Sequence, residues 1–129
     1  MIDAYESQAE LLKVLANPVR LQILDILREG EQCVCHLEAV LGLRQPYVSQ
    51  HLMVLRKAGL VVDRKDGLRV YYRVRDPGIY GLLDVARSLV SRRAQKKGLS
   101  LSFTLPNKGR ASRCVCPKCT QETSVAYAR

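Results

Sequence analysis

The sequence predicts one mainly α-helical domain with a single small β-hairpin, in the order helix, helix, helix, helix, strand, strand, helix. Apolar residues recur at helical spacing in five segments of the chain. Two β-prone runs flank Asp66-Gly67, the strongest short-range hairpin signal in the chain. With 129 residues, 47% of them hydrophobic, the chain suits one modest core rather than two.

The first four helices have recognisable starts and ends. Asn17 is a good N-cap, and Pro18 suits the first helical turn after it. Gly30, Gly42 and Gly59 each follow the last periodic apolar residue of a segment, where glycine ends helices. We therefore expect helices over residues 4–15, 17–30, 34–41 and 45–59, the last with a buried stripe of Val48, Leu52 and Leu55.

The hairpin is expected over Leu60–Lys65 and Arg69–Val74, joined across the Asp-Gly turn. Its second run alternates between two kinds of side chain, which predicts one apolar and one basic face. The apolar set is Val70, Tyr72 and Val74, and the other set is Arg69, Tyr71 and Arg73.

The last helix is expected to be capped by Asp76-Pro77. Its apolar stripe is wider than so small a core needs, and we assign the surplus to a dimer partner. The stripe consists of Ile79, Leu82, Leu83, Ala86, Leu89 and Val90.

Beyond residue 97 the pattern changes, so we divide the chain into a folded domain over residues 1–97 and a basic, cysteine-containing tail over residues 98–129. Apolar and polar residues alternate from Leu99 to Leu105, which is strand periodicity and predicts a short strand in the tail. Seven Lys or Arg and no acid lie between Arg92 and Arg113, a composition typical of a solvated segment.

Charge narrows the function class. The chain carries 21 Lys and Arg against 12 Asp and Glu, a formal net charge of +9 that favours polyanions such as nucleic acid. No apolar run is long enough to cross a membrane, and acids precede the first hydrophobic stretch, unlike in a signal peptide. We therefore expect a cytoplasmic protein without a membrane partner. No nucleophile with a base, phosphate-binding glycine loop or paired acids indicate an enzyme.

Two helices joined by a tight turn and followed by a basic hairpin describe a winged helix-turn-helix, whose second helix enters the major groove of double-stranded DNA. Side chains on its first turns would read base edges, and basic residues further on would contact phosphates. His51 fits a phosphate contact or a core or capping position equally well. The candidate DNA-contacting residues are Gln45, Tyr47, Ser49, Gln50, His51, Arg56, Arg64, Lys65, Arg69 and Arg73.

Four motifs in order resemble the ArsR/SmtB metalloregulators over roughly residues 5–92: the segments 15–21 (LANPVRL), 33–37 (CVCHL), 48–52 (VSQHL) and 59–61 (GLV). The resemblance is nearest to the arsenic-sensing branch. It implies a homodimer built on the first and last helices that represses an operon by binding its operator without a required cofactor. It also implies release from DNA when the inducer binds.

Five cysteines in a chain without an export signal favour thiolates for metal or redox work over a disulfide framework. They form two clusters, Cys33-x-Cys35 and the tail set Cys114, Cys116 and Cys119. Thiolates prefer soft ions such as As(III), Sb(III), Cd(II) and Pb(II), and As(III) is satisfied by three sulfurs. Two cysteines two apart on one helix point about 200° away from each other, so a shared ion requires Cys33 to precede or unwind the third helix. Ligation would then distort the support of the recognition helix.

The sequence departs from the arsenic-sensing pattern at the third ligand. Glu38 stands where that branch has its third cysteine, and His36 stands where it has an aspartate. Cadmium and lead sensors of the family take extra thiolates from the N-terminus, but residues 1–32 contain no cysteine. Either one tail cysteine completes the Cys33/Cys35 site, or the three tail thiols form a separate trigonal site. A zinc knuckle is a third interpretation of the tail set.

Other interpretations of these residues stay open. Cys33 and Cys35 could be small buried hydrophobes, and the tail triplet could be a disordered end. A repressor switched by thiol oxidation would use the same scaffold, whereas an architectural DNA binder would respond to neither metalloid nor oxidant. The zinc sites of the family lie on the last helix and need histidine, but the only histidines are His36 and His51, which leaves Asp76 and Asp84 without imidazole partners.

Overall fold

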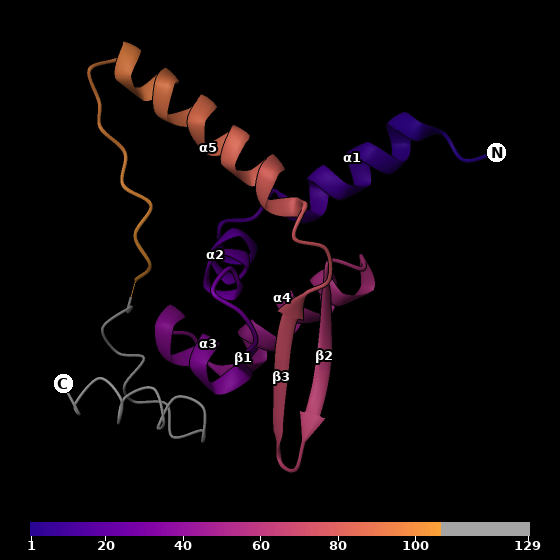
Figure 1. The fold of residues 1–129 in the computed structure, drawn as a ribbon. Helices are drawn as coiled ribbons and strands as arrows, with labels where there is room; N and C mark the ends of the chain where they lie inside the picture. The colour runs from indigo at the N-terminus through magenta and orange to yellow at the C-terminus, as the bar shows by residue number, and fades with distance from the viewer. Residues whose placement is uncertain (107–129) are drawn as a thin grey trace.

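The computed structural model describes residues 1–106 of the chain. It confirms the expected helices and hairpin and adds one short strand. Figure 1 shows their arrangement: α1 (Ala4–Leu15), α2 (Pro18–Leu27), β1 (Gln32–Cys33), α3 (Val34–Leu41), α4 (Gln45–Lys57), β2 (Val61–Asp66), β3 (Arg69–Val74) and α5 (Ile79–Lys96).

The main core lies where α2, α3 and α4 pack against the base of the hairpin. Burying each large aliphatic side chain there stabilises the fold by about 1.5–3 kcal/mol. The stripe expected on α4, Val48, Leu52 and Leu55, is fully inside it. The most buried side chains of the other elements are Ile23, Leu24, Leu37 and Val61.

Local signals set the helix ends that orient α4. The side chain of Asn17 accepts hydrogen bonds from the backbone N–H groups of Val19 and Arg20 at 2.9 and 3.2 Å, which caps α2. Gly42 has a φ of 66°, and its N–H donates to the carbonyl of Glu38, closing α3. This left-handed residue lets α4 begin three residues later, which completes the helix-turn-helix.

The sheet has three strands in the order β1-β3-β2, all antiparallel. The hairpin was expected, but β1 was not, because a two-residue strand leaves no alternating pattern. It pairs Gln32 with Tyr72 and Cys33 with Tyr71. The expectation of one wholly polar face on β3 is therefore wrong at Tyr71, which is only 6% exposed because β1 and α3 cover it.

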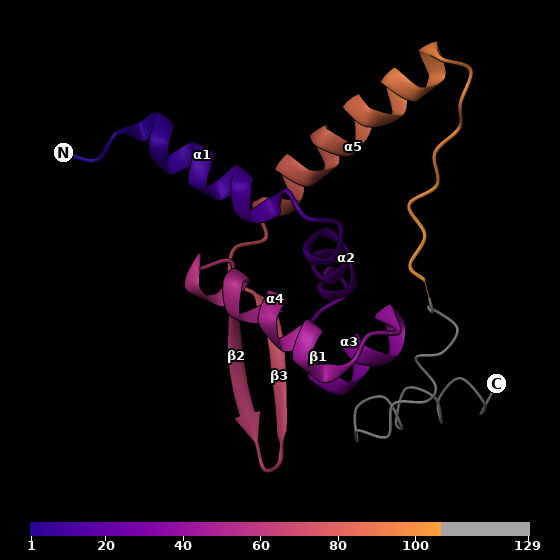
Figure 2. The same ribbon diagram turned by 180° about the vertical axis from the view of Figure 1, so that it is seen from behind.

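Helices α1 and α5 both project from the end of the molecule opposite the hairpin tip and diverge from each other (Figures 1 and 2). Both carry exposed apolar side chains: Leu12 on α1, and Leu82, Val85, Leu89 and Val90 on α5. Among residues 1–106, no helix combines the length and apolarity that crossing a bilayer requires.

Two expectations about the C-terminal half need correction. Asp76 does not cap α5 directly: its carboxylate accepts from the N–H of Gly78 at 2.9 Å, and the helix begins only at Ile79. Residues 99–105 form no strand, because no strand edge lies beside them to pair with. Of their apolar side chains, Leu105 packs against the main core, whereas Leu99, Leu101 and Phe103 remain exposed.

Candidate functional site: the helix-turn-helix, the hairpin and the cysteine pair

Helix α4 presents a polar face outward from its first turns. Gln45, Tyr47 and Gln50 are exposed and Ser49 is half-buried, while the buried stripe lies on the opposite side. Arg44 precedes the helix in an extended conformation, and Pro46 stands in the first turn, where its missing N–H has no helical partner to lose. The geometry suits a helix whose N-terminal turns enter a groove.

His51, on the same helix, points back toward α2 rather than outward. Its Nδ1 lies 3.2 Å from Nη1 of Arg20. Arg20 in turn donates from Nε to the carbonyl of Val14. Burial and the nearby Arg20 charge lower the pKa of His51 below its ordinary value. The structure thus places His51 in an interhelical contact.

Two of the candidate arginines, Arg56 of α4 and Arg64 of the hairpin, have carboxylate partners within the chain. Arg56 donates to Asp63 of β2 at 3.2 Å. Arg64 makes two hydrogen bonds to Glu31 at 2.7 and 3.1 Å, and its guanidinium lies 4.7 Å from the centre of the Tyr71 ring. These pairs are between exposed or half-exposed groups, which exchange partners at little cost.

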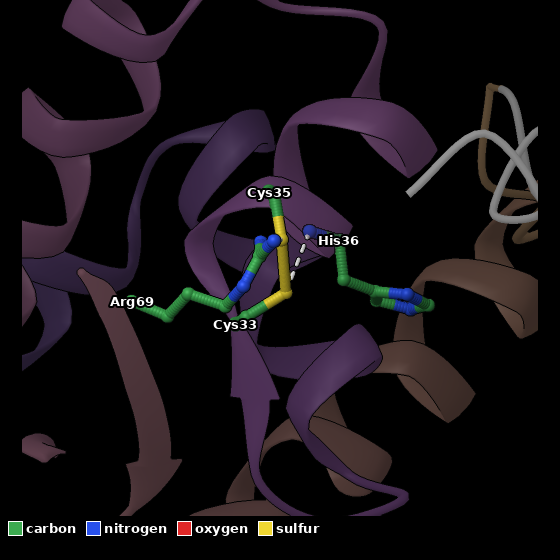
Figure 3. Close-up of a disulfide and its surroundings, with 4 residues drawn as sticks. All are labelled: Cys33, Cys35, His36 and Arg69. Carbon is green, nitrogen blue, oxygen red and sulfur yellow. Dashed lines mark hydrogen bonds between the residues drawn. A yellow bond between two sulfur atoms is a disulfide. The ribbon is translucent and has the colours of Figure 1, made fainter. Parts of the chain in front are cut away.

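Cys33 and Cys35 meet at the start of α3 and are joined in a disulfide, with Cα atoms 5.3 Å apart (Figure 3). Cys33 lies before the helix as its N-cap, the arrangement required for the two sulfurs to meet. Its sulfur accepts from the backbone N–H of His36 at 3.2 Å, and the guanidinium of Arg69 lies 3.7 Å from the sulfur of Cys35. The pair thus adjoins both the helix-turn-helix and the hairpin.

An open groove of about 430 Å³ runs past the two cysteines. Glu38 lines it one turn after Cys35, and burial raises the pKa of the Glu38 carboxyl. From α4 the groove is lined by Gln45 and Ser49, and from the hairpin by Leu68, Arg69, Val70 and Tyr72. A group bound to the sulfurs would therefore lie beside side chains expected to contact DNA.

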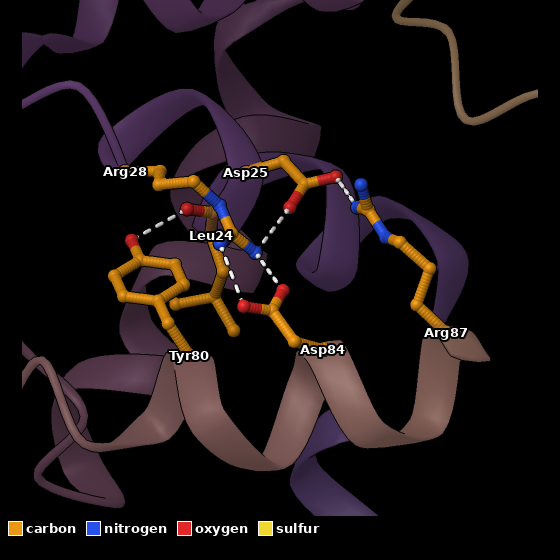
Figure 4. Close-up of polar contacts among 6 residues, drawn as sticks. All are labelled: Leu24, Asp25, Arg28, Tyr80, Asp84 and Arg87. Atoms are coloured by element: carbon orange, nitrogen blue, oxygen red, sulfur yellow. Dashed lines mark hydrogen bonds and ion pairs between the residues drawn. The ribbon is translucent and has the colours of Figure 1, made fainter. Parts of the chain in front are cut away.

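Asp84 of α5 belongs to an ion network with α2 (Figure 4). Arg28 donates to both of its carboxylate oxygens, at 2.9 and 3.3 Å, and this hydrogen bonding lowers the pKa of Asp84. Arg28 also lies over the ring of Tyr80, and Arg87 pairs with Asp25. Within the described residues, no three His, Cys, Asp or Glu side chains gather as a metal site.

Comparison with known proteins places this arrangement in a family. The sequence profile of the arsR family of bacterial regulatory proteins matches residues 17–62, from the start of α2 into β2. The transcriptional regulator Rv0081 of Mycobacterium tuberculosis is 42% identical over 89 residues, which cover 68% of this chain and 78% of that protein. The chain belongs to the ArsR/SmtB family.

Further comparisons refine what this ArsR/SmtB regulator is similar to. The crystal structure of Rv0081 superposes with a TM-score of 0.67 at 38% identity, covering 75% of this chain and 98% of that one. The homodimeric winged helix-turn-helix domain of Mb0332 from Mycobacterium bovis gives 0.62 at 32%, covering 69% and 82%. The arsenical resistance operon repressor of Escherichia coli is 48% identical over 66 residues, or 50% of this chain and 56% of that protein.

Membership fixes the general activity. The family consists of DNA-binding transcriptional regulators rather than enzymes, and this ArsR/SmtB regulator is a transcriptional repressor with the winged helix-turn-helix fold. The tail cysteines Cys114, Cys116 and Cys119 lie outside the described residues.

Three residues position the site of this ArsR/SmtB regulator in ways that the sequence pattern does not predict. Arg20 holds His51, Glu31 holds Arg64, and Tyr71 packs on Cys33. Periodicity describes single elements, so partners 31 or 33 residues apart leave no signal in it. For Tyr71 a signal existed: an aromatic residue between two arginines of a half-buried strand is poorly explained as solvent-facing.

Proposed function

We propose that this repressor binds operator DNA as a homodimer and releases it when Cys33 and Cys35 capture a thiophilic ion, As(III) or Sb(III). The observation that carries the proposal is the meeting of the two sulfurs at the start of α3. Soft trivalent ions prefer thiolate sulfur, and two adjoining cysteines provide two of the three bonds that As(III) needs. The E. coli relative named for arsenical resistance, 48% identical over 66 residues, supports the same ion class.

DNA binding is assigned to α4 and the hairpin. We propose that the first turns of α4 read bases, with Gln45, Tyr47, Ser49 and Gln50 in the major groove. Phosphates would be contacted by the basic side chains Arg56, Arg64, Lys65, Arg69 and Arg73. His51 would stay in its contact with Arg20. Arg56 and Arg64 would exchange their carboxylate partners for phosphates when DNA binds. Because exposed ion pairs are weak, this exchange would cost little.

The homodimer is assigned to the projecting helices α1 and α5, which carry exposed apolar side chains in the single chain. Leu82, Val85 and Leu89 are 39%, 60% and 48% exposed and recur on one stripe of α5. The homodimeric state of the Mb0332 domain supports this arrangement. A dimer would present two α4 helices to two half-sites of an operator.

Ion capture requires thiolates, so the Cys33–Cys35 disulfide must first be reduced. Two sulfurs then come from this pair, and a tail cysteine, Cys114, Cys116 or Cys119, would supply the third. Because Cys33 caps α3 through the N–H of His36, binding an ion at its sulfur competes with the cap. Loss of a cap destabilises a helix by about 0.5–2 kcal/mol, and α3 supports α4.

The test is operator binding measured by fluorescence anisotropy in the presence of reductant. Arsenite, antimonite, cadmium, lead and zinc are titrated separately against the wild type, Cys33→Ser, Cys35→Ser and a variant with Ser at all three tail cysteines. We expect arsenite or antimonite to release the wild type, and both single variants to bind the operator but no longer release it. Loss of release only in the tail variant would move the site to the tail.

A thiol-redox switch is the second candidate function, and the disulfide itself favours it. In that case a mild oxidant without metalloid would change operator affinity, and the change would disappear in Cys33→Ser. The two functions separate cleanly: arsenite acts only with the thiols reduced, whereas the redox switch acts only when they are oxidised. Release by oxidant combined with full operator binding at saturating arsenite under reductant would replace the metalloid proposal.

A further inference from the structure

The cysteine pair does not pack in the main core. It forms a second apolar cluster with Tyr71 of β3, in which Cys33 is 1% and Tyr71 is 6% exposed. Cys35 and Ala39 of α3 complete the cluster. The cluster therefore joins the candidate ion ligands to the hairpin rather than to α4.

The backbone makes the same connection. Cys33 lies in β1 directly across from Tyr71 of β3. Facing residues on antiparallel strands hold their Cβ atoms about 4.5–5.5 Å apart, so one cannot move far without the other. Because β3 pairs with β2 along its whole length and is joined to it by the turn at Gly67, a shift at Tyr71 is passed to the whole hairpin.

The ring of Tyr71 also contacts an arginine of the hairpin. The Arg64 guanidinium lies 4.7 Å from the ring centre and is steered by two hydrogen bonds to Glu31, which directly precedes β1. Tyr71 thus links the sulfurs on one element to a cation on another. That cation is one of the side chains assigned to operator phosphates.

An ion held by the two sulfurs lies about 2.3 Å from each of them. It therefore adds volume beside Cys33 and Tyr71, which are buried, and Cys35, which is half-buried. Protein interiors are close-packed and take up added volume by moving neighbours. On the α3 side the neighbour is Ala39, on a helix packed against the main core. On the other side the neighbour is Tyr71, on a hairpin whose tip projects into solvent.

We propose that Tyr71 is a positioning residue that passes ion capture at Cys33 and Cys35 to the hairpin, displacing Arg64 from its phosphate contact and so contributing to release. This rests on the proposed function and adds a route to it. The alternative route runs from α3 to α4 alone and leaves the hairpin contacts unchanged. The two routes predict different behaviour of hairpin variants.

The test compares operator dissociation constants with and without arsenite, under reductant, and defines their ratio as the release factor. In Arg64→Gln the ion-free complex loses a contact that the ion-bound complex has already lost. We therefore expect weaker ion-free binding and a release factor lowered by about the same factor. Lys65→Gln, a neighbouring hairpin cation that is not on the Tyr71 ring, should weaken both complexes equally and keep the wild-type release factor.

Tyr71 itself is tested in the same assay with arsenite stoichiometry measured in parallel. Tyr71→Val should lower the release factor at least fivefold with arsenite binding intact, and Tyr71→Phe, which keeps the ring, should restore it. A wild type released by arsenite whose Arg64→Gln variant keeps the full release factor overturns the relay alone. A wild type that is never released overturns the proposed function, and the relay with it.

Discussion

At the scale of single residues, His51 shows how an interhelical contact shifts a pKa. Its ring lies 3.2 Å from the Arg20 guanidinium and is half-buried, and burial followed by that charge lowers its pKa from the ordinary 6.5. Protonation therefore costs more in the folded than in the unfolded protein. The contribution of His51 to the free energy of unfolding is fully present above pH 6.5 and is lost as the pH drops through the folded-state pKa.

The change that tests this is His51→Gln, which removes the titrating group. We expect the loss of unfolding free energy between about pH 7 and about pH 5 to be smaller in this variant than in the wild type. Urea denaturation at the two pH values measures it. Equal losses in His51→Gln and the wild type would contradict the assigned pKa shift.

Sequence reasoning succeeded for residues whose role is local. Asn17 as a cap, Gly42 as a stop and the Val48, Leu52 and Leu55 stripe follow from periodicity and backbone preference alone. The sequence predicts that Cys33 and Cys35 can share an ion only if Cys33 precedes or unwinds the third helix, and Cys33 is the N-cap of α3. The partners of Arg56 and Arg64 depend on tertiary packing, which no local pattern encodes.

At the scale of elements, α2 and α5 are joined by a set of polar contacts. Tyr80 of α5 donates to the backbone carbonyl of Leu24 at 2.7 Å, and burial raises the pKa of Tyr80 to about 12. Arg28 lies over the same ring and binds Asp84. These contacts hold the first turns of the projecting α5 against α2.

Tyr80→Phe removes the hydroxyl and leaves the Leu24 carbonyl without that donor. We expect unfolding free energy to fall by about 0.5–1.5 kcal/mol, the usual net value of such a bond. Urea denaturation monitored by circular dichroism measures the change. Tyr5→Phe on exposed α1 is the matched control and should differ from the wild type by less than about 0.5 kcal/mol.

Elements were predictable where they are long. The helices and the hairpin follow from periodicities over six or more residues, whereas β1 has two residues and exists only because β3 offers an edge. The converse error occurred at residues 99–105, whose alternation predicted a strand although no edge lies beside them. Alternation marks a chain with two distinct faces, and pairing decides whether it becomes a strand.

At the scale of the whole molecule, the proposed homodimer depends on α1 and α5. Of the apolar stripe expected on α5, the single chain leaves Leu82, Leu89 and Val90 exposed, and Val85, which the expected stripe did not include, is exposed as well. Two copies of α5 in a symmetric pair would each bury these side chains, which doubles the effect of one substitution. Oligomeric state is therefore more sensitive to this stripe than folding is.

Val85→Asp should weaken dimerisation while leaving the protomer folded, because Val85 is 60% exposed. Removing two buried valines costs about 3 kcal/mol or more, or about a hundredfold in the dissociation constant. Sedimentation equilibrium measures it. Leu68→Asp, the same kind of change at the hairpin tip, should leave the dimer intact, and a Val85→Asp protein as dimeric as the wild type would rule out this face.

The segment after α5 has a practical consequence for anyone shortening the chain. Phe103 lies under the Arg87 guanidinium, 4.3 Å from it, and Leu105 reaches the main core, so together they roof an apolar hollow of about 340 Å³ between α2 and α5. A fragment cut at residue 97 would lose this cover and expose the apolar hollow to solvent, which favours self-association. A fragment cut after Pro106 would keep it.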